Sequence, residues 1–228
     1  MKNFISDKTL IIGLGLIGGS IAKSFKLQEI SREIWAYDLD YESIESAKNQ
    51  KIINGFQLLD DNLADFDLIV LCAPLNQYQN IFQKIHNKIN SKAIFFDIGS
   101  VKNFTFKNIP SNFIPCHPIA GSDKTGYENS NENLFFDKKF IICKKIDNFI
   151  DSPIAKITTK LGAKPIFLEP NLHDKIYGLV SHLPQFLAFL CAENSPKEFP
   201  NELIKNAFRL DQSNPQIWGD IFELNKKN

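Results

Sequence analysis

Residues 9–20 read Thr-Leu-Ile-Ile-Gly-Leu-Gly-Leu-Ile-Gly-Gly-Ser, an apolar run that ends in a glycine-rich turn. The apolar residues before Gly13 predict a buried strand, and Ile17, Ile21 and Phe25, at every fourth position, predict an amphipathic helix after the turn. The turn itself fits the pattern G-x-G-x-x-G. A strand, this turn and a helix in succession predict a dinucleotide-binding βαβ unit. The alternative is a glycine turn without a ligand.

The second strand of this unit is predicted at residues 33–38 and ends in Asp38, about 20 residues beyond the last glycine of the motif, as the pattern requires. A carboxylate there accepts hydrogen bonds from the ribose hydroxyls and repels a 2′-phosphate, and Leu39 follows it where an arginine would favour that phosphate. NAD is therefore expected as the cofactor rather than NADP. Including two residues that leave the next strand, the expected cofactor-binding residues are Gly13, Gly15, Leu16, Ile17, Gly18, Asp38, Ala73 and Pro74.

Short apolar runs alternate with helical patterns as far as residue 168 and predict an α/β fold. Continuous apolarity is typical of parallel strands that are covered on both faces, so we expect a Rossmann-type, doubly wound, mostly parallel sheet. The further predicted strands are residues 67–72, 93–97, 112–116, 139–143 and 164–168.

A small all-helical part is predicted after the sheet. Asn171 is the expected cap of a helix that reaches Cys191, with an interruption at Pro184, and two more helices are predicted at 202–208 and 215–224. We therefore expect a dinucleotide-binding domain over residues 1–170 and a shortened helical domain, for substrate binding and dimerisation, over residues 171–228.

Composition narrows the class of protein. Lys+Arg and Asp+Glu both number 26, so the formal net charge is zero, and the basic excess typical of nucleic-acid binders is absent. No apolar run is long enough for a membrane span, and the N-terminal residues lack the layout of a signal peptide. The four cysteines are scattered, which predicts reduced core residues rather than a metal or disulfide set. We expect a cytoplasmic protein with no nucleic-acid, membrane or metal partner.

Candidate catalytic residues follow the predicted strands, because ligands of such sheets bind beyond the carboxyl ends of the strands. His117 follows the strand at 112–116, and Ser100 lies in the loop after the strand at 93–97. A histidine of near-neutral pKa beside a hydroxyl can take a proton while a hydride leaves. The alternative for His117 is a structural hydrogen bond, and the simplest role for His173 and Asp174 is helix capping.

Several motifs carry a family resemblance. The segments are G-L-G-L-I-G-G-S, D-x-G-S-V-K at 97–102, H-P-I-A-G-S-D-K-x-G at 117–126, H-D-K-I at 173–176, S-H-L-P at 181–184 and R-x-x-x-x-x-P-x-x-W at 209–218. In this order they resemble prephenate dehydrogenases, the tyrosine-pathway enzymes that oxidatively decarboxylate prephenate or its amino analogue arogenate. The resemblance implies NAD-dependent formation of 4-hydroxyphenylpyruvate, a small-molecule substrate and a homodimer built by the C-terminal helices.

The resemblance also implies residue roles. His117 matches the catalytic base that accepts the proton of the ring 4-hydroxyl, and Ser100 matches the serine that orients this histidine and the hydroxyl. Arg209 matches the arginine that binds a substrate carboxylate, and Trp218 is expected to support its segment. The residues that fall on other substrate-binding positions are Ser122, Asp123, Ser181, His182 and Gln185.

Some positions depart from the family pattern. Gln185 stands where a second histidine is common, Asp123 stands where Glu is usual, and the sequence stops at Asn228, where relatives usually continue with helices of the dimer. These departures leave open an arogenate dehydrogenase, or a weakened relative that binds NAD or substrate without turnover. Another short Rossmann reductase is also an alternative, although it would not need the H-P-I-A-G segment.

Overall fold

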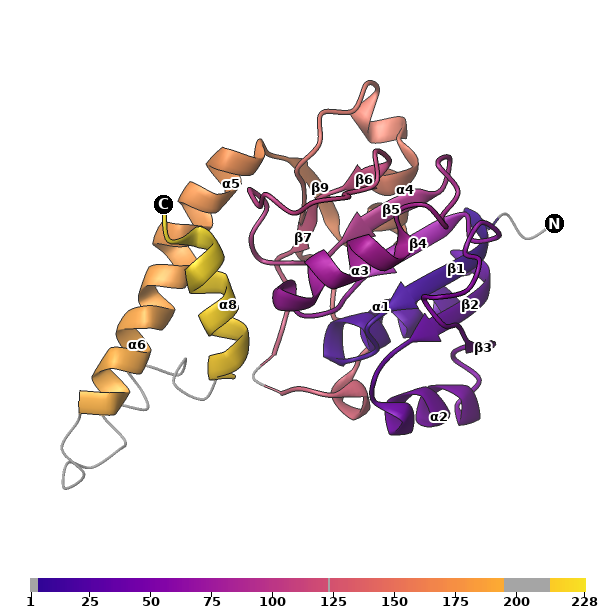
Figure 1. The fold of residues 1–228 in the computed structure, drawn as a ribbon, viewed down its shortest axis with the longest axis horizontal. Coiled ribbons are helices and arrows are strands. Elements are labelled where there is room, and N and C mark those ends of the chain that lie inside the picture. Colours follow the sequence, from indigo (N-terminus) through magenta and orange to yellow (C-terminus); the bar gives the residue numbers. More distant parts are fainter. Residues whose placement is uncertain (1–3, 123, 195–213) are drawn as a thin grey trace.

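The computed structural model describes residues 4–122, 124–194 and 214–228, and its larger part is a parallel sheet flanked by helices (Figure 1). The six strands are β1 (Ser6–Ile12), β2 (Ser31–Tyr37), β3 (Gly55–Phe56), β4 (Leu68–Leu71), β5 (Ile94–Asp97) and β6 (Phe113–Ile114). They pair in parallel in the order β3-β2-β1-β4-β5-β6. This is the strand order of a Rossmann-type doubly wound sheet, so the predicted fold class is confirmed.

Alternate side chains of the central strands enter two different apolar cores. The helices around them are α1 (Leu16–Leu27), α2 (Tyr41–Asn49), α3 (Tyr78–Ile85) and α4 (Pro153–Lys160). Ile11 of β1 belongs to the core that includes side chains of α1, α2 and α4, whereas Leu10 and Ile12 belong to the core that includes those of α3. Because both faces of the strand are buried, its sequence is continuously apolar rather than alternating.

A second, three-stranded sheet follows the first. Its strands are β7 (Cys116–Pro118), β8 (Lys139–Ile142) and β9 (Lys164–Phe167); β7 pairs with β8 antiparallel, and β8 with β9 in parallel. The single strand predicted at 112–116 is therefore wrong: it is β6 and β7, in different sheets, separated by Pro115. Proline cannot donate a ladder hydrogen bond, so pairing is interrupted at Pro115. The two-residue strand β3 was not predicted.

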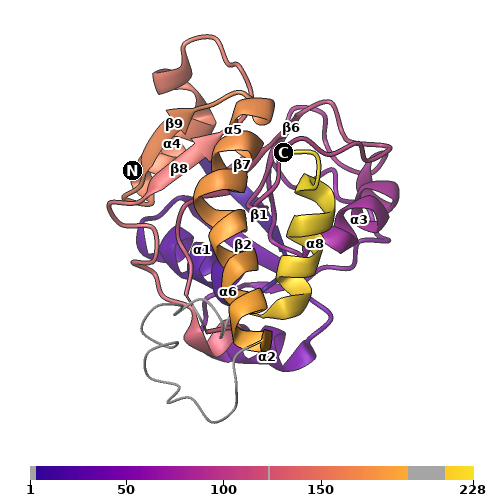
Figure 2. The same cartoon turned by 90° about the vertical axis from the view of Figure 1, so that its left-hand side faces the viewer.

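One long helical rod follows β9. It consists of α5 (Pro170–Tyr177), a π-helical segment (Gly178–His182) and α6 (Leu183–Asn194), and α8 (Pro215–Asn225) runs beside it (Figure 2). The chain stays helical through Pro184, where an interruption was predicted; the ladder only changes to the wider π pattern just before the proline, with Leu183 N–H donating to Gly178 O. The helix predicted at 202–208 lies outside the described residues.

One finer prediction about this region is wrong. Asn171 does not cap α5, because Pro170 occupies the first helical position and Glu169 the N-cap position, without a side-chain capping bond. Proline suits that position because its fixed φ matches the helix and its missing N–H is not needed there. Of the four cysteines predicted to be core residues, Cys116 and Cys143 are buried, Cys72 is partly buried and Cys191 is exposed on α6. In the described parts of the chain, no helix is both long and apolar enough to cross a membrane.

Candidate active site

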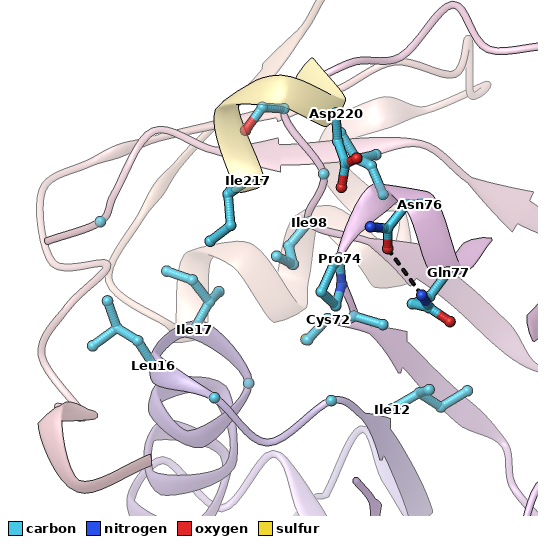
Figure 3. A pocket seen from close by; sticks show the side chains of 18 of the residues that line it. Ile12, Leu16, Ile17, Cys72, Pro74, Asn76, Gln77, Ile98, Ile217 and Asp220 are labelled. Atoms are coloured by element: carbon cyan, nitrogen blue, oxygen red, sulfur yellow. Dashed lines mark hydrogen bonds between the residues drawn. The ribbon is translucent and has the colours of Figure 1, made fainter. Parts of the chain in front are cut away.

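A cavity of about 1500 Å³ lies where β1, β4 and β5 end, at the point where the strand order reverses (Figure 3). All eight residues predicted to bind the cofactor line it, and so do Ser100, His117, Ser122 and Ser181. The residues come from the exits of separate strands and from the C-terminal helices. The fold therefore gathers into one cavity segments that the sequence places far apart.

The glycine turn has little space around two of its glycines. Gly13 has φ +97°, and a Cβ on it would lie 2.7 Å from the backbone carbon of Cys72. A Cβ on Gly18 would lie 1.9 Å from the carbonyl oxygen of Gly13, whereas one on Gly15 would meet nothing within 4 Å. Gly13 and Gly18 are thus required by the protein's own packing, while the space at Gly15 opens into the cavity, where a ligand's phosphates can approach the backbone.

Alanine substitutions should separate these two requirements. Gly18→Ala is expected to lower the free energy of unfolding by about 3 kcal/mol, because the new methyl group overlaps a backbone oxygen. Gly15→Ala should leave that free energy within about 0.5 kcal/mol of the original protein. It should instead raise the Kd for NAD roughly tenfold or more, about 1.4 kcal/mol. Urea unfolding and calorimetric titration of both variants measure the two effects; equal loss of stability in both would contradict the argument.

Asp38 lies at the end of β2 and faces the same turn. Its carboxylate accepts hydrogen bonds from the backbone N–H of Leu14 and, at 2.8 Å, from that of Asp40. Two carboxylate oxygens offer about four acceptor positions, so ribose hydroxyls can still be bound. The side chain is thereby held beside the turn with its charge toward the cavity.

His117 is the central residue of β7 and forms one end of a chain of three side chains. Its Nδ1 lies 2.9 Å from Nε2 of His173, and Nδ1 of His173 lies 2.7 Å from Oδ1 of Asp174. His173 and Asp174 are fully buried, whereas His117 is half-buried at the cavity. Tyr177 packs its ring against both histidines, with ring centroids 5.2 Å from His117 and 4.6 Å from His173. Ser100, the predicted partner of His117, lines the cavity, but the hydrogen bond of the His117 ring is to His173.

The surroundings keep both histidines neutral. Burial, assisted by the nearby His173, Lys102 and His182, holds the pKa of His117 well below 6.5. Burial also lowers the pKa of His173, although Asp174 opposes this. Burial would raise the pKa of Asp174, but hydrogen bonds from His173 and from two backbone N–H groups outweigh it and the pKa is lowered. At neutral pH the three groups are therefore two neutral imidazoles and a carboxylate, and His117 has an imidazole nitrogen ready to take a proton.

A buried ion pair joins the loop that carries Ser100 to β7, the strand that carries His117. Lys102 Nζ lies 2.6 Å from Oδ2 of Asp97, and both side chains are fully buried. Lys102 also donates to the carbonyl oxygen of Cys116, while Asp97 accepts from Cys116 N–H at 2.7 Å and from the Tyr78 hydroxyl at 2.9 Å. The pair thus joins the end of β5, the loop after it and β7.

The C-terminal helix α8 completes the cavity wall. In Figure 3 it crosses above the first turn of α1, with Ile217 pointing toward Ile17 and Asp220 close to Asn76. Trp218 also lines the cavity, and its ring centroid lies 6.0 Å from that of His182, which it meets edge to face. The helical part of the chain therefore contributes directly to the site rather than only supporting it. Among the described residues, no group of three His, Cys, Asp or Glu side chains is arranged to hold a metal ion.

Comparison with known proteins agrees with this arrangement over nearly the whole chain. Residues 21–164 match the family described as "Prephenate dehydrogenase, nucleotide-binding domain", and residues 169–228 match "Prephenate dehydrogenase, dimerization domain". The chain belongs to the prephenate dehydrogenase family. The resemblance inferred from the sequence motifs is confirmed.

Individual relatives carry the same name. Prephenate dehydrogenases of Lactococcus lactis and Bacillus subtilis are 32% and 25% identical over 96% and 98% of this chain, which spans 65% and 66% of their own lengths. The chain thus covers about two thirds of these relatives. A crystal structure of prephenate dehydrogenase from Aquifex aeolicus in complex with hydroxyphenyl propionate and NAD+ is similar with a TM-score of 0.86, 31% identity, and coverage of 97% of this chain and 83% of that one.

Two described residues that the family resemblance assigns to substrate binding do not line the cavity. His182 and Gln185 are buried in the helical rod, and His182 is hydrogen-bonded to the side chain of Asn225. The structure therefore places both behind the wall, where His182 contacts Trp218, rather than on its surface. Asp123 and Arg209 lie outside the described residues.

Sequence reasoning missed the partners of His117 and the role of Lys102. His173 and Asp174 had been assigned to capping, yet the Asp174 carboxylate accepts hydrogen bonds from the backbone N–H groups of Lys102 and Asn103, at 2.9 and 2.7 Å, in a different segment. The available signal was the family motif H-D-K-I, whose adjacent histidine and aspartate are both buried. For Lys102 the signal was the motif D-x-G-S-V-K, which begins with Asp97 and ends with Lys102, two side chains of opposite charge.

Proposed function

We propose that this protein catalyses the NAD-dependent oxidative decarboxylation of prephenate to 4-hydroxyphenylpyruvate. The observation that carries the proposal is His117, neutral and half-buried in the cavity that also contains the glycine turn. Membership of the prephenate dehydrogenase family supports the same reaction. We propose that the substrate's polar groups are bound by three residues that line the cavity, Ser100, Ser122 and Ser181. Arg209 is proposed to bind the substrate's carboxylate.

The residues of the site fit a dinucleotide. Gly15 leaves open space toward the cavity, backbone N–H groups at the start of α1 can bind phosphates, and Asp38 can bind a ribose. NAD, when bound, would accept the hydride that leaves C4 of the substrate ring. The chain's own part is to hold the ring in the cavity and to take the proton of the 4-hydroxyl at His117. Loss of carbon dioxide then gives an aromatic ring, which makes the reaction strongly favourable.

NADH formation by the purified protein tests this function. Prephenate and arogenate are each supplied with NAD, and NADP is used in parallel. We expect turnover of prephenate with NAD. Turnover of arogenate alone would assign the amino analogue as substrate. Absence of turnover on both, with NAD binding still detected by calorimetry, would contradict the enzymatic proposal and favour a binding protein without activity.

We also propose that the protein is a homodimer formed through the helical rod, in the cytoplasm. Apolar side chains that are 39–67% exposed run along α5, the π-helical segment and α6; they are Leu172, Ile176, Leu179, Val180, Leu183, Phe186, Leu187 and Leu190. A row of exposed apolar side chains of this kind is typical of a protein–protein interface. A second copy of this chain is the occupant favoured by the dimerization-domain match that covers these residues.

Light scattering during gel filtration measures the oligomeric state. Leu179→Asp is expected to shift the protein toward the monomer, whereas Ile150→Asp, at a similarly exposed apolar residue outside the rod, should not. A monomeric original protein at micromolar concentration would contradict the proposal. For location, cell fractionation with an antibody to the chain is the direct measurement.

A further inference from the structure

Asp174 has the hydrogen-bonding pattern of an acceptor held in a fixed position. Its Oδ1 accepts from the N–H of Lys102 and its Oδ2 from that of Asn103, so the carboxylate bridges from α5 to the loop after β5. Neither bond is made to the free N–H groups of its own helix, which is what a capping residue would do. The carboxylate therefore has a role other than capping α5.

The acceptor at Asp174 determines where the protons lie on both histidines. An ionised carboxylate has no proton to donate, so Nδ1 of His173 must donate to Oδ1 of Asp174 across 2.7 Å. A neutral His173 then has a bare Nε2, which can only accept, and the hydrogen bond of 2.9 Å requires Nδ1 of His117 to be the donor. A neutral His117 with its proton on Nδ1 has an unprotonated Nε2.

We propose that His173 and Asp174 are positioning residues, which hold His117 in the Nδ1–H tautomer with Nε2 free to accept the proton of the substrate hydroxyl. The inference rests on the proposed function for the role of His117, but the tautomer itself follows from the hydrogen bonds alone. After proton transfer, the imidazolium of His117 still donates to His173, and the carboxylate at the far end of the chain stabilises the new positive charge.

The packing supports a fixed geometry. Both members of the pair are fully buried, and the ring of Tyr177 lies against the two histidines. Asn225 of α8 donates to the backbone oxygen of Asp174 at 2.9 Å, which ties the start of the rod to the last helix. Side chains with so many packed neighbours cannot rotate freely, so one orientation of the His117 ring is maintained without a ligand.

Asp174→Asn is the sharpest variant, because the amide keeps the size of the carboxylate but offers an N–H to His173. If that N–H points at Nδ1 of His173, the protons move along the chain and His117 is left with its proton on Nε2 instead of Nδ1. We expect kcat for NADH formation to fall by about 10²-fold or more, the contribution typical of a positioned base, while KM for prephenate and Kd for NAD change by less than about threefold. The exposed Asp60→Asn serves as the matched control.

The protonation state is measured directly by nitrogen-15 NMR of the histidine rings. In the original protein His117 should carry its proton on Nδ1; in Asp174→Asn the proton should move to Nε2 when the amide N–H faces His173 and stay on Nδ1 when the amide oxygen faces it. His173→Gln is the second variant; its amide oxygen can still accept from His117, so it should keep the Nδ1 proton of His117 and lose less kcat than Asp174→Asn.

Two outcomes would overturn the inference: a proton on Nε2 of His117 in the original protein, or a kcat for Asp174→Asn within threefold of the original, since that variant lacks the negative charge in either orientation of its amide. If Asp174→Asn does not fold, the NMR measurement on the original protein and on His173→Gln decides. If the original protein forms no NADH from either substrate, the proposed function fails, but the tautomer measurement still tests the chain of hydrogen bonds.

Discussion

Replacing His117 by Asn is expected to lower kcat for NADH formation by roughly 10²–10⁴-fold, the range typical of positioned general-base catalysis. The Asn amide can still donate a hydrogen bond to Nε2 of His173, so the packing of the buried pair is retained. It has no basic nitrogen, however, and cannot take the proton of the substrate hydroxyl. Because His117 lines the cavity at a different place from the glycine turn, the Kd for NAD should remain within about threefold of its original value.

Steady-state kinetics and calorimetric titration of NAD measure these two quantities. His86→Asn is the matched control, since His86 lies at the end of α3 and does not line the cavity. A kcat within a few-fold of the original would exclude His117 as the base and would direct attention to the other groups of the cavity. Loss of NAD binding would instead indicate that the substitution disturbs β7.

The cofactor half of the site could be predicted from the sequence because its determinants are local. Gly13, Gly15 and Gly18 act within one turn, and Asp38 ends the next strand of the same βαβ unit, so spacing along the chain fixes their positions in space. The doubly wound sheet was predictable for the same reason, since β1, β2, β4 and β5 each coincide with a short apolar run. All the predicted cofactor residues line the cavity.

The catalytic half depends on contacts between segments that are distant in the sequence. His117 and His173 are brought together only when the rod packs on the second sheet, and no periodic pattern near either residue reports that contact. The division of one predicted strand into β6 and β7 has a similar origin: Pro115 interrupts the pairing, but the sheet that β7 then joins is decided by β8. From its position near a predicted helix start, His173 was therefore predicted to cap that helix, and its hydrogen bond to His117 was missed.

The buried pair of Lys102 and Asp97 leads to the second large prediction. Lys102→Met keeps a flexible side chain of similar length but removes the charge, leaving the Asp97 carboxylate buried without its cation. We expect the free energy of unfolding to fall by about 3–5 kcal/mol, because an unpaired buried charge retains its full desolvation cost. The hydrogen bonds from Tyr78 and Cys116 to Asp97 offset only part of that cost. Urea unfolding followed by circular dichroism measures the change.

A comparison with an exposed pair separates burial from charge. Lys84 and Asp60 are 3.2 Å apart but 47% and 70% exposed, so Lys84→Met should change the free energy of unfolding by only about 0–1 kcal/mol. Adding Asp97→Asn to Lys102→Met should recover part of the lost stability, since the double variant no longer buries a net charge. If both lysine substitutions changed the free energy of unfolding equally, Asp97 would not be a buried, unpaired carboxylate in Lys102→Met. Because the pair joins the loop of Ser100 to the strand of His117, Lys102→Met is also expected to lower kcat at temperatures where the variant remains folded. A structural role far from the cavity would not produce that loss.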